Sequence, residues 1–185
     1  IGDNRSYSYL PSRKGNTISD QVAQHVLKWI DTNYKSYSWL DRGSDERQYC
    51  SPGINLPVVT LHRDPPGRFP EYHTSADDFN TISADSLEEV YNACLGYIDV
   101  LEKNYAYVNM FPNCEPQLGR RGLYRKVGGQ RSNQVSHVAI KWILNYSDGK
   151  HDLLDISKKS KIRIKELNSA ASALEKQGII VRILK

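Results

Sequence analysis

The chain has 185 residues, of which 39% are hydrophobic and 25% are charged, and its formal net charge is +4 at pH 7. This composition is typical of a folded globular protein, and the length allows one large domain or two small ones with a buried core. No apolar run approaches the roughly 18 residues that a membrane span needs. The polar opening lacks the apolar stretch of a signal peptide. We therefore expect no membrane partner, and the start without Met suggests a piece of a longer protein.

Cysteine usage and charge distribution add two expectations. Cys50, Cys94 and Cys114 are odd in number and include no Cys-x-x-Cys pair, so we expect buried thiols in a reducing cytoplasm and no disulfide framework. Residues 1–116 hold 10 Lys/Arg and 16 Asp/Glu, whereas residues 117–185 hold 15 and 5. The two parts are therefore expected to face different partners.

The first half alternates a predicted helix with short predicted strands. Ser19 or Asp20 can cap a helix in which apolar residues recur every four positions until about Asn33. Short strands are predicted over 37–40 and 57–61, the second of them rich in β-branched residues. This alternation favours an α/β layered domain.

A long helix is predicted from about Ser83 to Asn104. The run Ser86-Leu87-Glu88-Glu89 has the form of a capping box. A set of apolar residues follows with helical period, and we expect it to pack against the domain and to anchor the loop that precedes it. Its members are Leu87, Val90, Tyr91, Cys94, Leu95, Ile98 and Leu101.

The C-terminal part predicts a second, smaller domain. Residues 105–134 are rich in Pro and Gly and are expected to be an extended connection. Helices are predicted from Val135 to a stop at Ser147, over 152–160 and over 163–177, and a strand is predicted over 179–184. Three helices followed by a strand is the order of a winged helix.

Several motifs of the first half occur in one order. They are Gly43-Ser44-Asp45-Glu46, Gly53-Ile54-Asn55-Leu56-Pro57-Val58-Val59, Glu71-Tyr72-His73-Thr74 and Asp77. This order resembles the last third of the di-zinc aminopeptidase superfamily, which includes bacterial leucyl aminopeptidases and glutaminyl cyclases. The closest resemblance is to an uncharacterised bacterial family in which such a domain ends in a winged helix.

The resemblance implies a domain plan. Residues 1–108 would be the C-terminal portion of a three-layer α/β aminopeptidase-like domain. Residues 109–131 would be a basic linker, and residues 132–185 a winged helix-turn-helix domain. The stretch from Gln117 to Arg131 holds five basic residues and no acidic one, so it could also bind a polyanion.

The resemblance also implies a site. His73 would be the last metal ligand, Asp3 a further ligand by its position after a strand, and the Tyr72 hydroxyl a donor to an oxyanion. Asp45 and Asp77 would orient the metal ligands through hydrogen bonds, without binding the metal themselves. Two zinc ions would activate a water for amide or peptide hydrolysis. From the residues alone, a single histidine on a polar loop is no metal site, and the remaining ligand motifs are absent, so this chain cannot complete a two-zinc site by itself.

Two other functions stay open. The winged helix could bind DNA through its third helix and the turn before it, or it could serve protein docking, including self-association into a homo-oligomer. The candidate DNA-binding residues are Lys158, Lys159, Lys161, Arg163 and Lys165. The aminopeptidase-like part could also be a scaffold that has lost catalysis.

Overall fold

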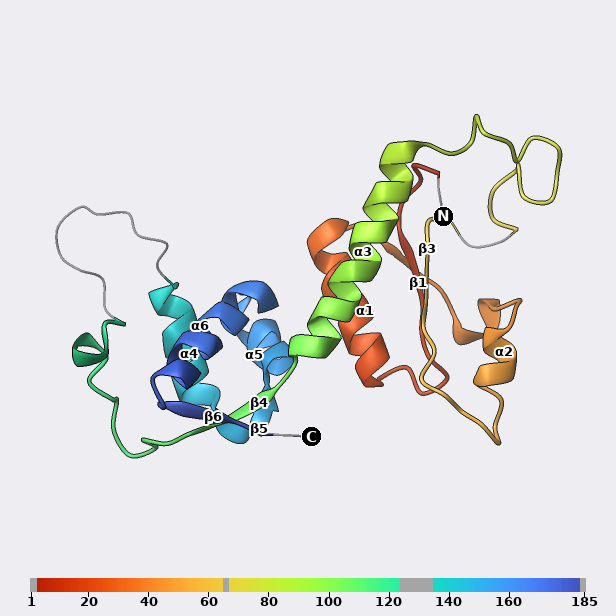
Figure 1. Cartoon of the computed structure of the whole chain (residues 1–185). Coiled ribbons are helices and arrows are strands. Elements are labelled where there is room, and N and C mark those ends of the chain that lie inside the picture. Colours follow the sequence, from red (N-terminus) through yellow and green to blue (C-terminus); the bar gives the residue numbers. More distant parts are fainter. Residues whose placement is uncertain (1–2, 65–66, 124–134, 184–185) are drawn as a thin grey trace. The chain divides into compact units, whose positions relative to one another are not determined.

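The computed structural model describes residues 3–64, 67–123 and 135–183 (Figure 1). The chain divides into two compact units, Ile1–Asp99 and Val100–Lys185, and each is described by itself. Both units combine helices with a small sheet, which confirms the predicted α/β class with a winged helix at the C-terminal end. In the described ranges no helix is both long and apolar enough to cross a membrane.

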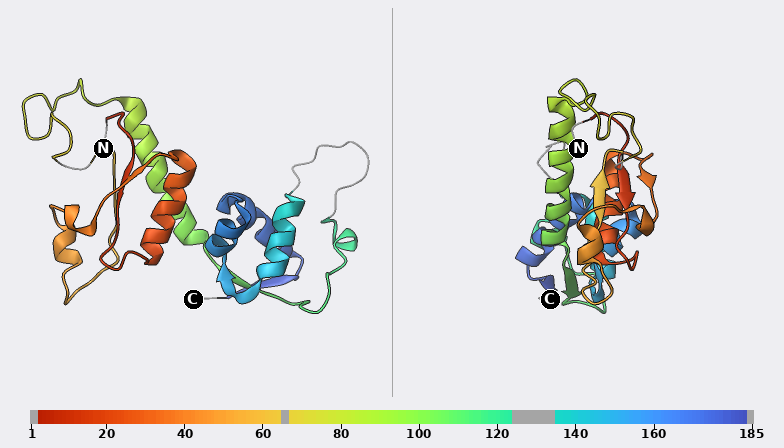
Figure 2. Two further views of the ribbon diagram at one scale, coloured as in Figure 1. Left: turned by 180° about the vertical axis from the view of Figure 1, so that it is seen from behind. Right: turned by 90° about the vertical axis from the view of Figure 1, so that its right-hand side faces the viewer.

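The first unit is built on a three-stranded sheet of order β2-β1-β3. Its elements are β1 (Ser8–Leu10), α1 (Ile18–Ile30), β2 (Lys35–Ser36), the 3₁₀ helix η1 (Trp39–Asp41), α2 (Glu46–Tyr49), β3 (Thr60–His62) and α3 (Ala84–Lys103). β1 is parallel to β2 and antiparallel to β3. α1 and α3 lie along one face of the sheet and α2 lies on the other side (Figures 1 and 2). β1 is buried along its whole length because both of its faces are covered.

The core of this unit forms between the sheet and the two long helices. Its buried members are Tyr7, Tyr9, Ala23, Leu27 and Ala93. They come from β1 and the residue before it, from α1 and from α3, so the central strand and both helices are tied by one apolar cluster.

A buried carboxylate fixes the start of α1. Thr17 caps the helix. Asp20, the third residue of the helix, accepts a hydrogen bond from the Thr17 backbone N–H at 2.8 Å. Asp20 also accepts the Ser12 N–H at 2.7 Å and the Tyr9 hydroxyl at 2.5 Å. Burial raises the pKa of Asp20, but the hydrogen bonds from Ser12, Thr17 and Tyr9 outweigh it and hold the pKa below its usual value. The predicted cap at Ser19 or Asp20 is therefore wrong by two or three positions.

The strand predicted over 37–40 is wrong. This stretch contains η1, which begins after Ser38, whose hydroxyl accepts the Leu40 N–H at 3.2 Å. The Trp39 ring lies 4.4 Å from the Arg42 guanidinium carbon. Capping and stacking favour a tight turn here, and the strand that pairs with β1 is the two residues before it.

The capping box predicted at Ser86 is also displaced. α3 begins at Ala84, and the Ser83 hydroxyl accepts the Ser86 N–H at 3.1 Å. Ser86 lies within the first turn and is buried. A serine three residues upstream performs the same task equally well, so the sequence pattern alone could not choose between them.

The packed face predicted for α3 is wrong as well. The buried positions of α3 are Ser86, Ala93 and Val100, whereas most of the apolar residues expected to pack, Cys94 among them, are exposed. α3 carries two adjacent apolar faces, and periodicity cannot say which of them meets the core. Cys114 is exposed too, so of the three thiols only Cys50 is buried as expected.

The second unit is a winged helix-turn-helix. Its elements after α3 are β4 (Ala106–Asn109), the 3₁₀ helix η2 (Gly119–Arg121), α4 (His137–Tyr146), β5 (Asp148–Asp152), α5 (Leu153–Ser160), α6 (Ile164–Lys176) and β6 (Ile180–Arg182). The sheet is antiparallel with order β5-β4-β6. The three helices pack on it around a core that includes Tyr107, Ile143, Leu153, Leu167 and Leu174.

Two strands of this sheet differ from expectation. β4 lies in the stretch predicted to be a connection, and β5 follows the predicted helix stop. Both pair with segments distant in sequence, and a short strand defined by long-range pairing leaves a weak local pattern. The predicted basic linker falls partly on residues 124–134, outside the described residues.

Candidate functional site

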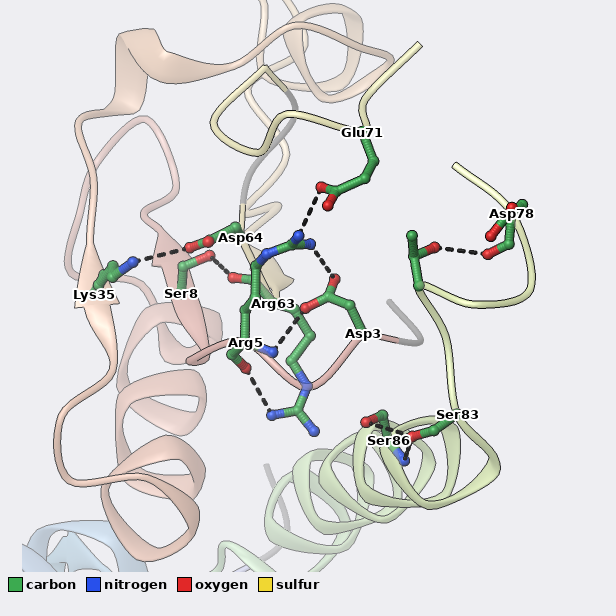
Figure 3. Close-up of polar contacts among 11 residues, drawn as sticks. Asp3, Arg5, Ser8, Lys35, Arg63, Asp64, Glu71, Asp78, Ser83 and Ser86 are labelled. Atoms are coloured by element: carbon green, nitrogen blue, oxygen red, sulfur yellow. Dashed lines mark hydrogen bonds and ion pairs between the residues drawn. The ribbon is translucent and has the colours of Figure 1, made fainter. Parts of the chain in front are cut away.

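Arg5 joins the N-terminal segment to the loop that carries Tyr72 and His73. Its backbone N–H donates to Asp3 Oδ1 at 2.8 Å, and its guanidinium Nη2 donates to Glu71 Oε2 at 2.7 Å (Figure 3). The second oxygen of Asp3 lies 3.8 Å from Arg5 Nη1. Asp3 is largely buried. One arginine thus links two carboxylates that are 68 residues apart in sequence.

The histidine of the motif lies on a tight turn after Glu71. His73 has a positive φ of 60°, and the Thr74 N–H donates to the Glu71 carbonyl at 3.0 Å. The Tyr72 and His73 rings are stacked, with centroids 3.9 Å apart, and Phe69 contacts Tyr72 edge-on at 5.4 Å. Tyr72 is half-buried and His73 is exposed. The turn therefore presents the imidazole to solvent with its ring orientation constrained by stacking.

The two predicted supporting carboxylates lie on exposed turns. Asp45 precedes α2 and makes no side-chain cap to it. The Asp77 backbone N–H donates to the Thr74 carbonyl at 3.2 Å. Within the described ranges no hydrogen bond joins either side chain to His73, so their role stays a prediction.

The described residues do not fit a metal ion by themselves. Nowhere in the described part of the chain do three His, Cys, Asp or Glu side chains come together closely enough to hold one. Structural and catalytic zinc sites need three or four protein ligands. One carboxylate oxygen of Asp3 is already used by Arg5. His73 and Asp3 can therefore be ligands only in a site completed by residues from outside the described part.

Arg5 also lines a cavity of about 560 Å³. Arg5, Tyr7, Arg63 and Glu89 contribute to its lining. Arg63 is buried, forms an ion pair with Glu89, and lies 4.0 Å from the centroid of the Tyr7 ring. Burial raises the pKa of the Tyr7 hydroxyl, although the nearby Arg63 charge opposes the rise. Asp31 lines the cavity as well, so its walls carry charges of both signs.

His62, the last residue of β3, is a second histidine of the first unit, and its side chain points away from the core under α1 and α3. Its neighbour Leu61 packs against the core under α1 and α3. Successive side chains of a strand alternate, so His62 faces the side of α2, where Glu46 and Arg42 influence its charge. Burial lowers its pKa, which favours the neutral imidazole.

Sequence patterns missed the residues that hold this site together. The spacing Asp3-x-Arg5 is compatible with a carboxylate that accepts the N–H two residues on, and Glu71 directly precedes Tyr72, so both had a local signal. Arg63 had none. Its hydrogen bond to the Arg5 carbonyl, 3.0 Å long, spans 58 residues and depends on the pairing of β1 with β3.

The winged helix presents its basic residues around the turn between α5 and α6. Lys158, Lys159, Lys161, Arg163 and Lys165 are all exposed. Lys161 ends α5 in the left-handed region, with φ of 61°. Lys158 lies 3.9 Å from Asp155, and Lys159 Nζ lies 5.5 Å from the Tyr146 ring. The cluster surrounds the start of α6, the third helix of the domain.

The fold and the site define a mixed α/β unit, with a charged cluster next to an exposed Tyr-His turn, joined to a winged helix. The chain belongs to the family described as a domain of unknown function, DUF4910, whose model matches residues 1–104. The model of a winged helix-turn-helix matches residues 105–182.

Two relatives come from Clostridium acetobutylicum. One is a protein named for polysaccharide biosynthesis and an aminopeptidase-like domain, 41% identical over 174 residues that cover 94% of this chain. The other is a crystal structure named for a peptidase, with a TM-score of 0.87 at 37% identity over 99% of this chain. The chain spans 40% of the length of each relative. Both names agree with the resemblance to aminopeptidase-like proteins.

Proposed function

We propose that this chain is the part of an aminopeptidase-like metallohydrolase that supplies His73 and Asp3 as metal ligands and Tyr72 as an oxyanion donor. The observation that supports the proposal is the Arg5 bridge, because it holds Asp3 and the loop of His73 in a fixed relation. The zinc ions, likewise proposed, would be bound only together with ligands from outside this chain.

The substrate is proposed to be an amide or peptide. The cavity beside Arg5 and Arg63 is also lined by Asp31 and Glu89, so it offers groups of both charges to a polar substrate. The name of the curated relative adds an amide borne by a saccharide to the candidates. In this proposal Tyr72 would donate to the charge that develops on the carbonyl oxygen, and Arg5 would position the loop.

Metal analysis of a longer protein tests the ligand assignment. This chain would replace its counterpart in the Clostridium acetobutylicum relative, and bound zinc would be counted by mass spectrometry. We expect His73→Ala to lose at least one equivalent, whereas His25→Ala, on α1, should retain all of them. Unchanged stoichiometry in His73→Ala would remove the ligand assignment.

The role of Tyr72 has a separate test in the same protein. Tyr72→Phe should lower kcat by roughly 10²- to 10³-fold with a smaller change in KM, since an oxyanion donor acts mainly in the transition state. A change confined to KM would make Tyr72 a binding residue. If neither kcat nor KM changes, the reading of this part as a non-catalytic scaffold is favoured.

A second function, nucleic-acid binding by the winged helix, is favoured by the basic residues around the start of α6. Affinity for duplex DNA should fall steeply with salt, because each neutralised phosphate releases condensed counterions. The measurement is fluorescence anisotropy of the whole chain at two salt concentrations. Arg163→Glu with Lys165→Glu should abolish binding, whereas Lys141→Glu with Lys150→Glu, on α4 and β5, should retain most of it. Without salt-sensitive binding, the domain is a protein-docking module.

A further inference from the structure

Helix α3 has two apolar faces, of which the first unit uses one. On the used face, Ala93 joins the core with Tyr7 and Leu27, and Val90 and Tyr97 pack against the same cluster. Figure 2 shows α3 beside α1 and the sheet of the first unit. The used face accounts for the attachment of α3 to its own unit.

The second face is exposed. Its residues in the first unit, which we call the α3 stripe, are Leu87, Tyr91, Cys94, Leu95 and Ile98. They recur at spacings of three and four, so they share one side of the helix. The exposed fractions are 63% for Tyr91 and 54% for Ile98. A surface helix usually turns charged and polar residues to solvent opposite its core face, so a contiguous apolar stripe of this kind marks a contact surface.

Both relatives extend well beyond the region that they share with this chain. They share the fold of this chain over almost its full length, yet 60% of each relative lies outside the shared region, because the chain spans 40% of them. The sheet under α3 has three strands, and its edge strands β2 and β3 hold two and three residues. In layered α/β domains a helix of this kind packs across neighbouring strands of a wider sheet.

We propose that the α3 stripe is the docking surface for a remainder of the kind that the relatives have outside the shared region, which would present an apolar face to it. Two observations favour this occupant, namely the length of the relatives outside the shared region and the charge of the first unit. Residues 1–99 hold 14 Asp/Glu against 9 Lys/Arg, and Glu88 flanks the stripe. Two copies of this surface would bring like charges together, which disfavours self-association. The inference needs neither zinc nor catalysis.

The three cysteines provide a built-in reporter. Cys94 lies in the stripe, Cys114 is exposed in the second unit, and Cys50 is buried. Maleimide labelling followed by site-resolved mass spectrometry would be compared between the chain alone and the protein in which it replaces its counterpart in the Clostridium acetobutylicum relative. We expect Cys94 to react at least about tenfold more slowly in the longer protein. Cys114 should keep its rate in both.

Substitutions on α3 then locate the contact. In the longer protein, Tyr91→Glu or Ile98→Glu should restore rapid labelling of Cys94. Asn92→Glu adds the same charge about 120° around the helix from Ile98 and should not. Slow labelling of Cys50 in each variant verifies that the first unit is folded, and Tyr91→Ser replaces any variant that fails this check.

Two results would overturn the inference. One is equal Cys94 labelling in the chain alone and in the longer protein. The other is protection of Cys94 in the chain alone that increases with its concentration, which would assign the stripe to a second copy. Protection of Cys94 in a longer protein that binds no zinc would support the docking surface and remove the metal proposal, so the two proposals fail separately.

Discussion

Helices α3 and α6 differ in how much of their apolar surface is buried within their own unit. Five apolar residues of α6 are between 0% and 2% exposed, because the sheet and the other two helices of the winged helix enclose them; they are Ile164, Leu167, Ala170, Ala171 and Leu174. On α3 the most exposed apolar side chain, Tyr91, reaches 63%. Both helices have a clear amphipathic pattern. Apolar periodicity therefore identifies a helix face that is suited to burial. Whether that face is buried depends on which elements pack against the helix.

The largest effect that would test this contrast comes from paired leucine truncations. Leu167→Ala on α6 should destabilise the second unit by about 2–5 kcal/mol, because it leaves a cavity in a closed core. Leu95→Ala in the α3 stripe should change the stability of this chain by less than about 0.5 kcal/mol. Hydrogen exchange at amides of each unit, measured with increasing denaturant, separates the two effects. Equal losses would mean that the stripe is packed within this chain.

A second test concerns the polar bonds that support the first unit. Asp20→Ala should cost about 1–3 kcal/mol, since it leaves the buried Ser12 N–H and Tyr9 hydroxyl without their acceptor. Glu88→Ala, an exposed acidic site on α3, is the matched control and should be nearly neutral. Thermal unfolding of both variants gives the comparison.

Asp20 also sets a pH dependence. Its folded pKa is lower than its unfolded pKa, so its stabilisation is fully present above the unfolded value near 3.8 and is lost as the pH falls through the folded value. The acid branch of the stability curve should therefore be shallower in Asp20→Ala. A variant with the same acid dependence as the wild-type chain would show that this carboxyl is not preferentially ionised in the folded state.

The smallest effect concerns a glycine within strand β5 of the winged helix. Gly149 has φ of +80°, and a Cβ there would lie 3.3 Å from Ile183 Cδ1 and 3.4 Å from Val108 Cγ2. Gly149→Ala should destabilise the second unit by about 1 kcal/mol. Gly43→Ala, where a Cβ meets open space and φ is not positive, is the control. Equal stability in the two variants, judged from urea midpoints, would mean that β5 tolerates a side chain at this position.

The candidate site likewise combines a local motif that the sequence shows with a long-range contact that it does not. The Tyr72-His73 pair was recognisable because a short motif lies within one loop. The ion pair of Arg5 with Glu71 spans 66 residues, and a contact of that range leaves no periodicity in the sequence. In the described part of the chain, no three His, Cys, Asp or Glu side chains come together closely enough to hold a metal ion, so the roles of His73 and Asp3 as ligands stay predictions.

The α/β class with a C-terminal winged helix could be predicted from the sequence alone. Periodicity located α1, α3 and the three winged-helix segments to within a few residues, because a helix makes its hydrogen bonds and its stripe locally. The tertiary structure decided which apolar face of α3 is buried, that Ala106–Asn109 is the central strand of the second sheet, and that Arg5 ties Asp3 to the loop of His73. Each of these depends on contacts between segments distant in the chain, and such contacts form only when the elements pack.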